Sequence, residues 1–79
     1  MGEPDPRWED VTDGWGVAWV LELDDGRSLE VREVDGQGGL TVSLHDEHGR
    51  MVYECDMRTD DPHAAQRAIE GEARERGWT

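Results

Sequence analysis

The chain has 79 residues, 20 of them acidic and 8 basic, and its formal net charge is −12 at pH 7. Such a charge repels DNA, RNA and anionic membranes, so it argues against direct binding to any of them. The single cysteine excludes an internal disulfide, and no secretory leader or apolar run of about 18 residues is present, so we expect a cytoplasmic, non-membrane protein.

Residues 1–13 are acidic, contain two prolines and show no periodicity. We expect them to form a flexible arm, which Trp8 or Val11 could attach to the fold. A chain of this length holds one small hydrophobic core, and we therefore predict a single domain over residues 14–79.

Residues 15–23 alternate between large apolar and small or polar side chains, which predicts a strand with one buried face. Asp24, Asp25 and Gly26 follow and suit a three-residue hairpin loop with glycine in the left-handed conformation. This loop would place Leu21 opposite Leu29 and Trp19 opposite Val31.

Two further breaker clusters, at 35–38 and 46–49, separate strands predicted at 27–34, 39–45 and 50–58. Treating both clusters as four-residue loops leaves the apolar residues of every strand on one face. Across the second and third strands the predicted partners are Val31 with Val42, Leu29 with Leu44, and Glu33 with Leu40. Across the third and fourth strands they are Leu44 with Met51, Val42 with Tyr53, and Leu40 with Cys55.

The C-terminal segment predicts a helix that begins after Asp61 as N-cap and Pro62 as first residue, and ends near Gly77. Its expected apolar face is thin and consists of Ala65, Ala68, Ile69, Ala73 and Trp78. Gly71 lies in the helix interior, where close approach to the sheet would explain it.

These elements predict an α+β fold, namely a four-stranded antiparallel meander with one C-terminal helix packed on one face. The opposite face carries polar residues and should be solvated. In an open meander the first strand is an edge, and this one has neither lysine nor proline in its middle to prevent pairing. We therefore expect that edge to be a site of homodimerisation.

Several side chains invite a chemical reading. His45 and His48, with two carboxylates between them, have a zinc-like composition. Their position in a hairpin turn makes an ordinary polar turn the stronger interpretation, so we expect no metal or cofactor. Cys55 is predicted to face inward as a small core residue. Glu33 either enters the core, where desolvation would raise its pKa, or reaches water from a frayed strand end, as we expect.

No nucleophile with a paired base and no phosphate-binding loop is evident, so we expect no enzymatic activity. The leading hypothesis is a non-catalytic module that binds a protein partner. The acidic surface would favour a basic partner. The residues expected at the interface are Trp8, Trp15, Val17, Val20 and Glu22. An alternative is an acidic mimic of nucleic acid that inhibits a DNA- or RNA-binding enzyme, and a weaker one is a metal- or ligand-binding module.

Overall fold

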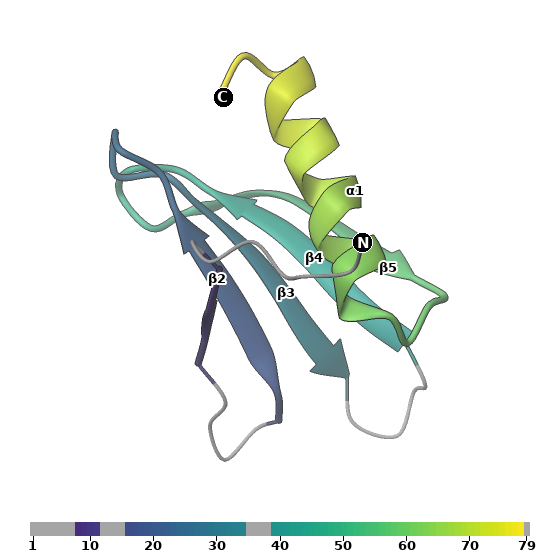
Figure 1. Cartoon of the computed structure of the whole chain (residues 1–79). Coiled ribbons are helices and arrows are strands. Elements are labelled where there is room, and N and C mark those ends of the chain that lie inside the picture. Colours follow the sequence, from purple (N-terminus) through teal and green to yellow (C-terminus); the bar gives the residue numbers. More distant parts are fainter. Residues whose placement is uncertain (1–7, 12–15, 35–38, 79) are drawn as a thin grey trace.

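A computed structural model describes residues 8–11, 16–34 and 39–78. They form an α+β fold in which an antiparallel sheet carries one helix on one face (Figure 1). The sheet has five strands in the order β1-β2-β3-β4-β5, so the prediction of four was wrong by one. The elements are β1 (Trp8–Asp10), β2 (Ala18–Glu22), β3 (Ser28–Val34), β4 (Gly39–His45), β5 (Met51–Met57) and α1 (Pro62–Glu75).

The additional strand, β1, comes from the segment expected to be an arm. It pairs antiparallel with β2, placing Trp8 opposite Leu21 and Asp10 opposite Trp19. The strand is only three residues long and two of them are acidic, so the sequence shows no alternation of apolar and polar side chains there. The pairing of β1 with β2 therefore depends on the tertiary packing of Trp8. Because β1 lies along β2, the prediction that the first strand of the meander is an unpaired edge was wrong.

The first two hairpin registers of the meander are as predicted. Leu21 lies opposite Leu29 and Trp19 opposite Val31 between β2 and β3. The β2–β3 turn closes with Leu23 donating its N–H to the Arg27 carbonyl at 2.8 Å, and Gly26 has φ of 92°. Between β3 and β4 the expected partners are likewise confirmed: Val31 with Val42, Leu29 with Leu44, and Glu33 with Leu40.

The β4–β5 register differs from the prediction by two residues. The backbone N–H of Asp46 donates to the Arg50 carbonyl at 2.9 Å and closes a three-residue turn, where a four-residue loop was expected. Gly49 in this turn has φ of 80°. Such a turn alone would flip the faces of β5, because the side-chain period of a strand is two. A bulge at Val52 restores the pattern. The resulting partners are Leu44 with Tyr53, Val42 with Cys55, and Leu40 with Met57.

The helix begins and ends where its capping residues predict. Asp61 accepts the His63 backbone N–H at 3.0 Å, and Pro62 is the first helical residue. At the other end Trp78 donates its N–H to the Ala73 carbonyl at 2.9 Å and Gly77 has φ of 78°, which is a Schellman cap.

The buried face of α1 differs from the prediction at two positions. Ala68 is exposed, and Gln66 is buried in its place among the residues that meet the sheet. A Cβ atom at Gly71 would meet nothing within 4 Å, so close approach to the sheet is not why glycine is present.

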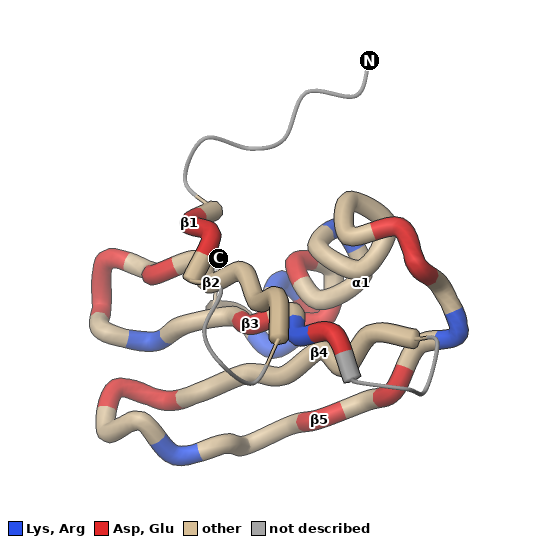
Figure 2. The backbone as a smooth tube through the Cα atoms, turned by 90° about the horizontal axis from the view of Figure 1, so that it is seen from below, with Lys and Arg blue, Asp and Glu red and all other residues tan. Residues whose placement is uncertain are grey.

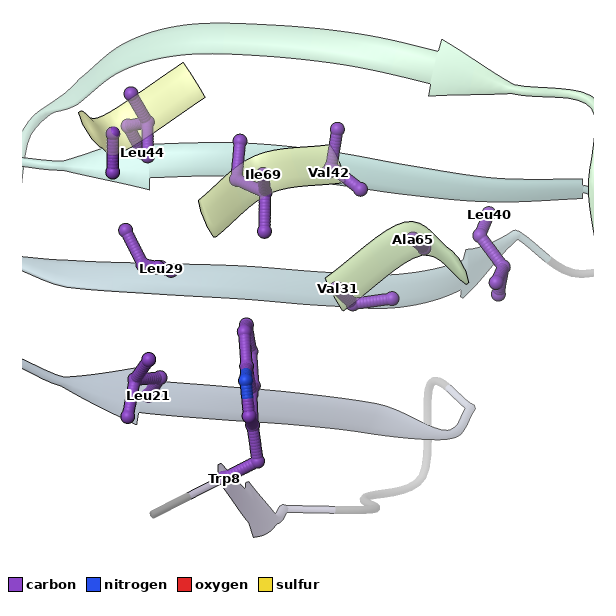
Figure 3. Close-up of a cluster of buried hydrophobic side chains, with 10 residues drawn as sticks. Trp8, Leu21, Leu29, Val31, Leu40, Val42, Leu44, Ala65 and Ile69 are labelled. Atoms are coloured by element: carbon purple, nitrogen blue, oxygen red, sulfur yellow. The ribbon is translucent and has the colours of Figure 1, made fainter. Parts of the chain in front are cut away.

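The hydrophobic core lies between α1 and strands β2, β3 and β4 (Figure 3). Leu29, Val31 and Leu44 are fully or almost fully buried beneath Ile69. The Trp8 side chain extends from β1 over β2 and is 9% exposed. Trp19, Tyr53 and Trp78 pack against this cluster from its margins. The core therefore includes an N-terminal residue that the sequence pattern left outside it.

Acidic residues occur on strands β1, β2, β3 and β5, on the turns and on the helix, whereas β4 has none (Figure 2). The charge is thus distributed over the surface of the fold and is not confined to one element.

No helix formed by the described residues has the length and apolar character needed to cross a membrane.

Candidate binding pocket

A pocket of about 330 Å³ opens between the β1–β2 pair and the first turns of α1. This volume is at the small end of the range of ligand pockets, about 300–1,000 Å³. It would hold one side chain or a small molecule. The residues that line it are Trp8, Asp10, Trp19, Pro62, His63 and Gln66.

Strand geometry brings Trp8, Asp10 and Trp19 together. Trp8 and Asp10 are two residues apart on β1, so their side chains project from the same face. Trp19 lies directly opposite Asp10 on β2. The pocket wall therefore has two indoles and one exposed carboxylate.

Trp8 is held in one orientation by its polar atom as well as by burial. Its indole Nε1 donates to Glu70 Oε2 at 2.9 Å, which ties β1 to the middle of α1. Trp19 is only half-buried. Trp8 thus acts as a fixed wall, whereas part of the Trp19 surface is accessible to a bound group.

The helix contributes the remaining polar groups. His63 and Gln66 are three residues apart and so lie on adjacent positions of one helix face. Gln66 is 5% exposed, and His63 is half-buried. Aromatic surfaces beside a carboxylate are the groups that bind organic cations in proteins, through the aromatic ring quadrupole and charge-assisted hydrogen bonds.

A second polar cluster lies on the sheet face opposite the helix. Ser43 Oγ is 3.0 Å from His45 Nε2, which is 3.1 Å from Glu30 Oε1, and Arg32 pairs with Glu30 Oε2 at 3.1 Å. A serine–histidine–acid relay needs the acid on the ring nitrogen that the serine does not use. Here both contacts involve Nε2, so we interpret the cluster as a structural network on the sheet.

The two histidines considered as metal ligands make different contacts. His45 belongs to the network just described, whereas His48 is exposed in the β4–β5 turn, 3.7 Å from a Glu47 carboxylate oxygen. The described residues contain no group of three or more His, Cys, Asp and Glu side chains arranged to hold a metal ion. The turn itself is organised by Asp46, which accepts the backbone N–H groups of His48 and Arg50 at 2.9 Å each.

Cys55 is exposed, and the prediction that it is a core residue was wrong. It is opposite Val42, but α1 packs mainly on β3 and β4 and does not cover Cys55. Its neighbours Tyr53 and Met57 are half-buried against the margin of the core, and the guanidinium carbon of Arg76 lies 4.9 Å from the centre of the Tyr53 ring. Interaction with the neighbouring Cys55 side chain raises the pKa of Tyr53 above its usual value, with smaller contributions from desolvation and from the Glu72 charge and an opposing one from Arg76. Glu33, the other residue in question, is exposed to solvent as expected.

The predicted interface residues occupy different environments. Trp8 lines the pocket, and Trp15 lies outside the described residues. Val17 accepts the Glu33 N–H at 2.9 Å, and Val20 is half-buried between Glu9 and Glu30 on neighbouring strands. Glu22 is exposed at the end of β2. The structure thus places one of these five residues in the pocket. Asp10, His63 and Gln66 were not identified from the sequence, because the pairing of β1 with β2 is what places Trp8 and Asp10 beside the start of α1.

Comparison with curated proteins finds a partial relative, described as an uncharacterized N-acetyltransferase of Streptomyces avermitilis. It is 46% identical over 46 residues, which is 58% of this chain. The matched segment spans 11% of the length of that relative. No protein-family model matches the chain, and no solved structure matches it.

Proposed function

We propose that this chain is a non-catalytic interaction module that binds a basic protein partner by taking an arginine side chain into the pocket between β1–β2 and α1. One observation carries the proposal: two tryptophans and the Asp10 carboxylate line the same pocket. A guanidinium group stacks on indole faces and forms paired hydrogen bonds with a carboxylate.

The charge of the chain supports this choice of partner. A net charge of −12 attracts basic segments from a distance and accelerates their association. The rigid Trp8 wall supports it as well, because a preorganised aromatic pocket loses little conformational entropy on binding. Tryptophan and arginine are also the residue types that most often dominate the energy of protein interfaces.

The partial relative is compatible with a modular role. Its matched segment is a small part of a much longer protein. A binding module can recur within a larger polypeptide without sharing its chemistry, since function resides in sites and not in folds. The scattered acidic residues give no particular support to the nucleic-acid mimic, which would need carboxylates aligned at phosphate-like spacing (Figure 2).

The proposal can be tested by NMR titration of the chain with a short glycine-flanked arginine peptide. The control is the same peptide with citrulline, which keeps the shape of arginine and removes its charge. We expect the Trp8 and Trp19 indole signals to shift with the arginine peptide and to remain in place with citrulline. Equal shifts with both peptides, or none with arginine, would contradict the proposal.

Two variants localise the effect. Asp10→Asn keeps the shape of the pocket and removes its carboxylate, so we expect arginine-peptide affinity to fall by about fivefold, the equivalent of roughly 1 kcal/mol. Glu9→Gln removes the same charge from the neighbouring exposed position, and we expect a change of no more than about twofold. Equal losses in both variants would show that only the overall charge matters.

A further inference from the structure

The outer edge of β5 is a second surface suited to a partner. β5 (Met51–Met57) pairs with β4 on one side, and no other described strand pairs with its outer side. The strand is exposed over most of its length, and it includes the two exposed large apolar residues of the described chain, Met51 at 52% and Val52 at 44%. An unpaired edge of this kind is a template for an additional strand.

The two faces of β5 differ in character beyond the bulge. Glu54 and Asp56 lie on the helix-free face, opposite Ser43 and Thr41 of β4. Tyr53, Cys55 and Met57 alternate with them on the helix-bearing face, where Cys55 is exposed and the other two are half-buried against the margin of the core. Glu54 is exposed, and Asp56 accepts a hydrogen bond from Thr41 Oγ1 at 3.0 Å. The segment 53–57 therefore presents carboxylates on one face and partly apolar side chains on the other, and Arg76, a cation at the C-terminal end of α1, lies over Tyr53 on the face away from the carboxylates.

A second copy of the chain is a poor occupant of this edge. Antiparallel self-pairing centred on Cys55 would place Glu54 of each copy opposite Asp56 of the other, and like charges directly opposite are destabilising. A pairing centred closer to the start of β5 would run through the bulge at Val52, which interrupts regular pairing. The charge of −12 on each copy adds to this repulsion.

We infer that the β5 edge accepts an extended segment of a partner protein as a sixth strand, with basic residues opposite Glu54 and Asp56 and apolar residues at the alternate positions. Backbone hydrogen bonds would supply much of the affinity, and the alternation would set the register. This edge and the pocket are at opposite ends of the sheet order, so the inference shares with the proposed function only the binding of a basic protein.

The test uses two synthetic peptides of identical composition. One alternates, Thr-Val-Arg-Val-Arg-Val-Thr, and the other groups its valines, Thr-Arg-Val-Val-Val-Arg-Thr. Amide chemical shifts and hydrogen exchange are followed for β5, and the Trp8 and Trp19 indole signals report on the pocket. We expect the alternating peptide to shift the β5 amides, slow their exchange, and bind about fivefold more tightly than the grouped peptide.

Matched variants on opposite edges of the helix-free face complete the test. Glu54→Lys should weaken the alternating peptide by about fivefold, while Glu9→Lys, with the same change in charge on β1, should alter it by no more than about twofold. Thermal melting confirms that both variants are folded. Equal binding of the two peptides overturns the inference, as does protection of β5 that grows with protein concentration without peptide. If only the Trp8 and Trp19 indole signals shift, the β5 inference is wrong and the pocket proposal stands. If the β5 amides shift and the indole signals do not, the β5 inference stands and the pocket proposal is wrong.

Discussion

Replacing Trp8 with alanine tests whether β1 is an integral part of the fold. Trp8 is 9% exposed, packs in the core cluster and donates its indole N–H to Glu70. Removing the side chain leaves a cavity under β1 and takes away the main reason for this short strand to remain paired with β2. We therefore expect a large loss of stability from a residue of the shortest strand of the described sheet.

The magnitude follows from the buried area. A tryptophan buries about 150–250 Å², which at about 25 cal/mol/Å² gives roughly 4–6 kcal/mol. Residual burial in the unfolded chain reduces such values by about 10–40%, to roughly 2–5 kcal/mol. Measured Trp→Ala losses in cores fall in the same range, about 3–5 kcal/mol. A domain of this size has a total stability of only about 4–12 kcal/mol, so the variant should be close to unfolding.

Urea denaturation followed by far-UV circular dichroism measures the effect, with thermal melting as a second readout. Each kcal/mol corresponds to about 4–8 °C for a domain of this size, so Tm should fall by at least about 12 °C. Trp8→Phe retains an aromatic ring and should cost about 1 kcal/mol for the lost indole hydrogen bond. The neighbouring exposed change Glu9→Ala should stay within about 0.5 kcal/mol. A loss below about 1 kcal/mol for Trp8→Ala would refute the view that β1 belongs to the cooperative core.

Two further predictions concern the helix and the β4–β5 turn. Gly71→Ala should raise the free energy of unfolding by about 1 kcal/mol, because the new methyl group meets nothing within 4 Å and alanine is the better helix former; a higher urea midpoint checks this, and a lower one contradicts it. The backbone N–H of Arg50, with a smaller contribution from that of His48, holds the pKa of Asp46 below its usual value. Its contribution to stability is therefore present above the usual aspartate pKa and lost as the pH falls through the lowered folded value. Between pH 6 and pH 2.5, the urea midpoint of the wild type should thus fall further than that of Asp46→Asn, and parallel declines would contradict this assignment.

The sequence predicted the parts of the fold that depend on local rules. Turn chemistry at Gly26 and the apolar alternation of the flanking strands determine the β2–β3 register together, and both agree with the structure. The helix bounds follow from Asp61 and Gly77, which are capping residues with few alternatives. The β3–β4 register follows in the same way from the matching apolar faces.

The errors arise where two local rules conflict or where tertiary contacts decide. At the β4–β5 turn, the turn geometry preferred by Gly49 and the apolar pattern of β5 require pairing registers that differ by one residue. A bulge in β5 satisfies both. The burial of Cys55 was predicted wrongly, because a side chain on the helix-bearing face of the sheet was assumed to be buried. A single helix covers only part of a five-stranded sheet. The pocket was not predictable, since it depends on β1, a strand that three residues alone do not reveal.

The bulge at Val52 also bears on how this protein could change in length. Met51 is opposite His45 and Tyr53 is opposite Leu44, so Val52 is the one residue of β5 that the ladder does not use. Deleting a residue from a strand normally reverses every side chain beyond it. Here the loss of Val52 would leave each existing cross-strand pair intact and convert the hairpin to a regular one. Val52 is therefore a position inside a strand at which a single-codon deletion is compatible with the same fold.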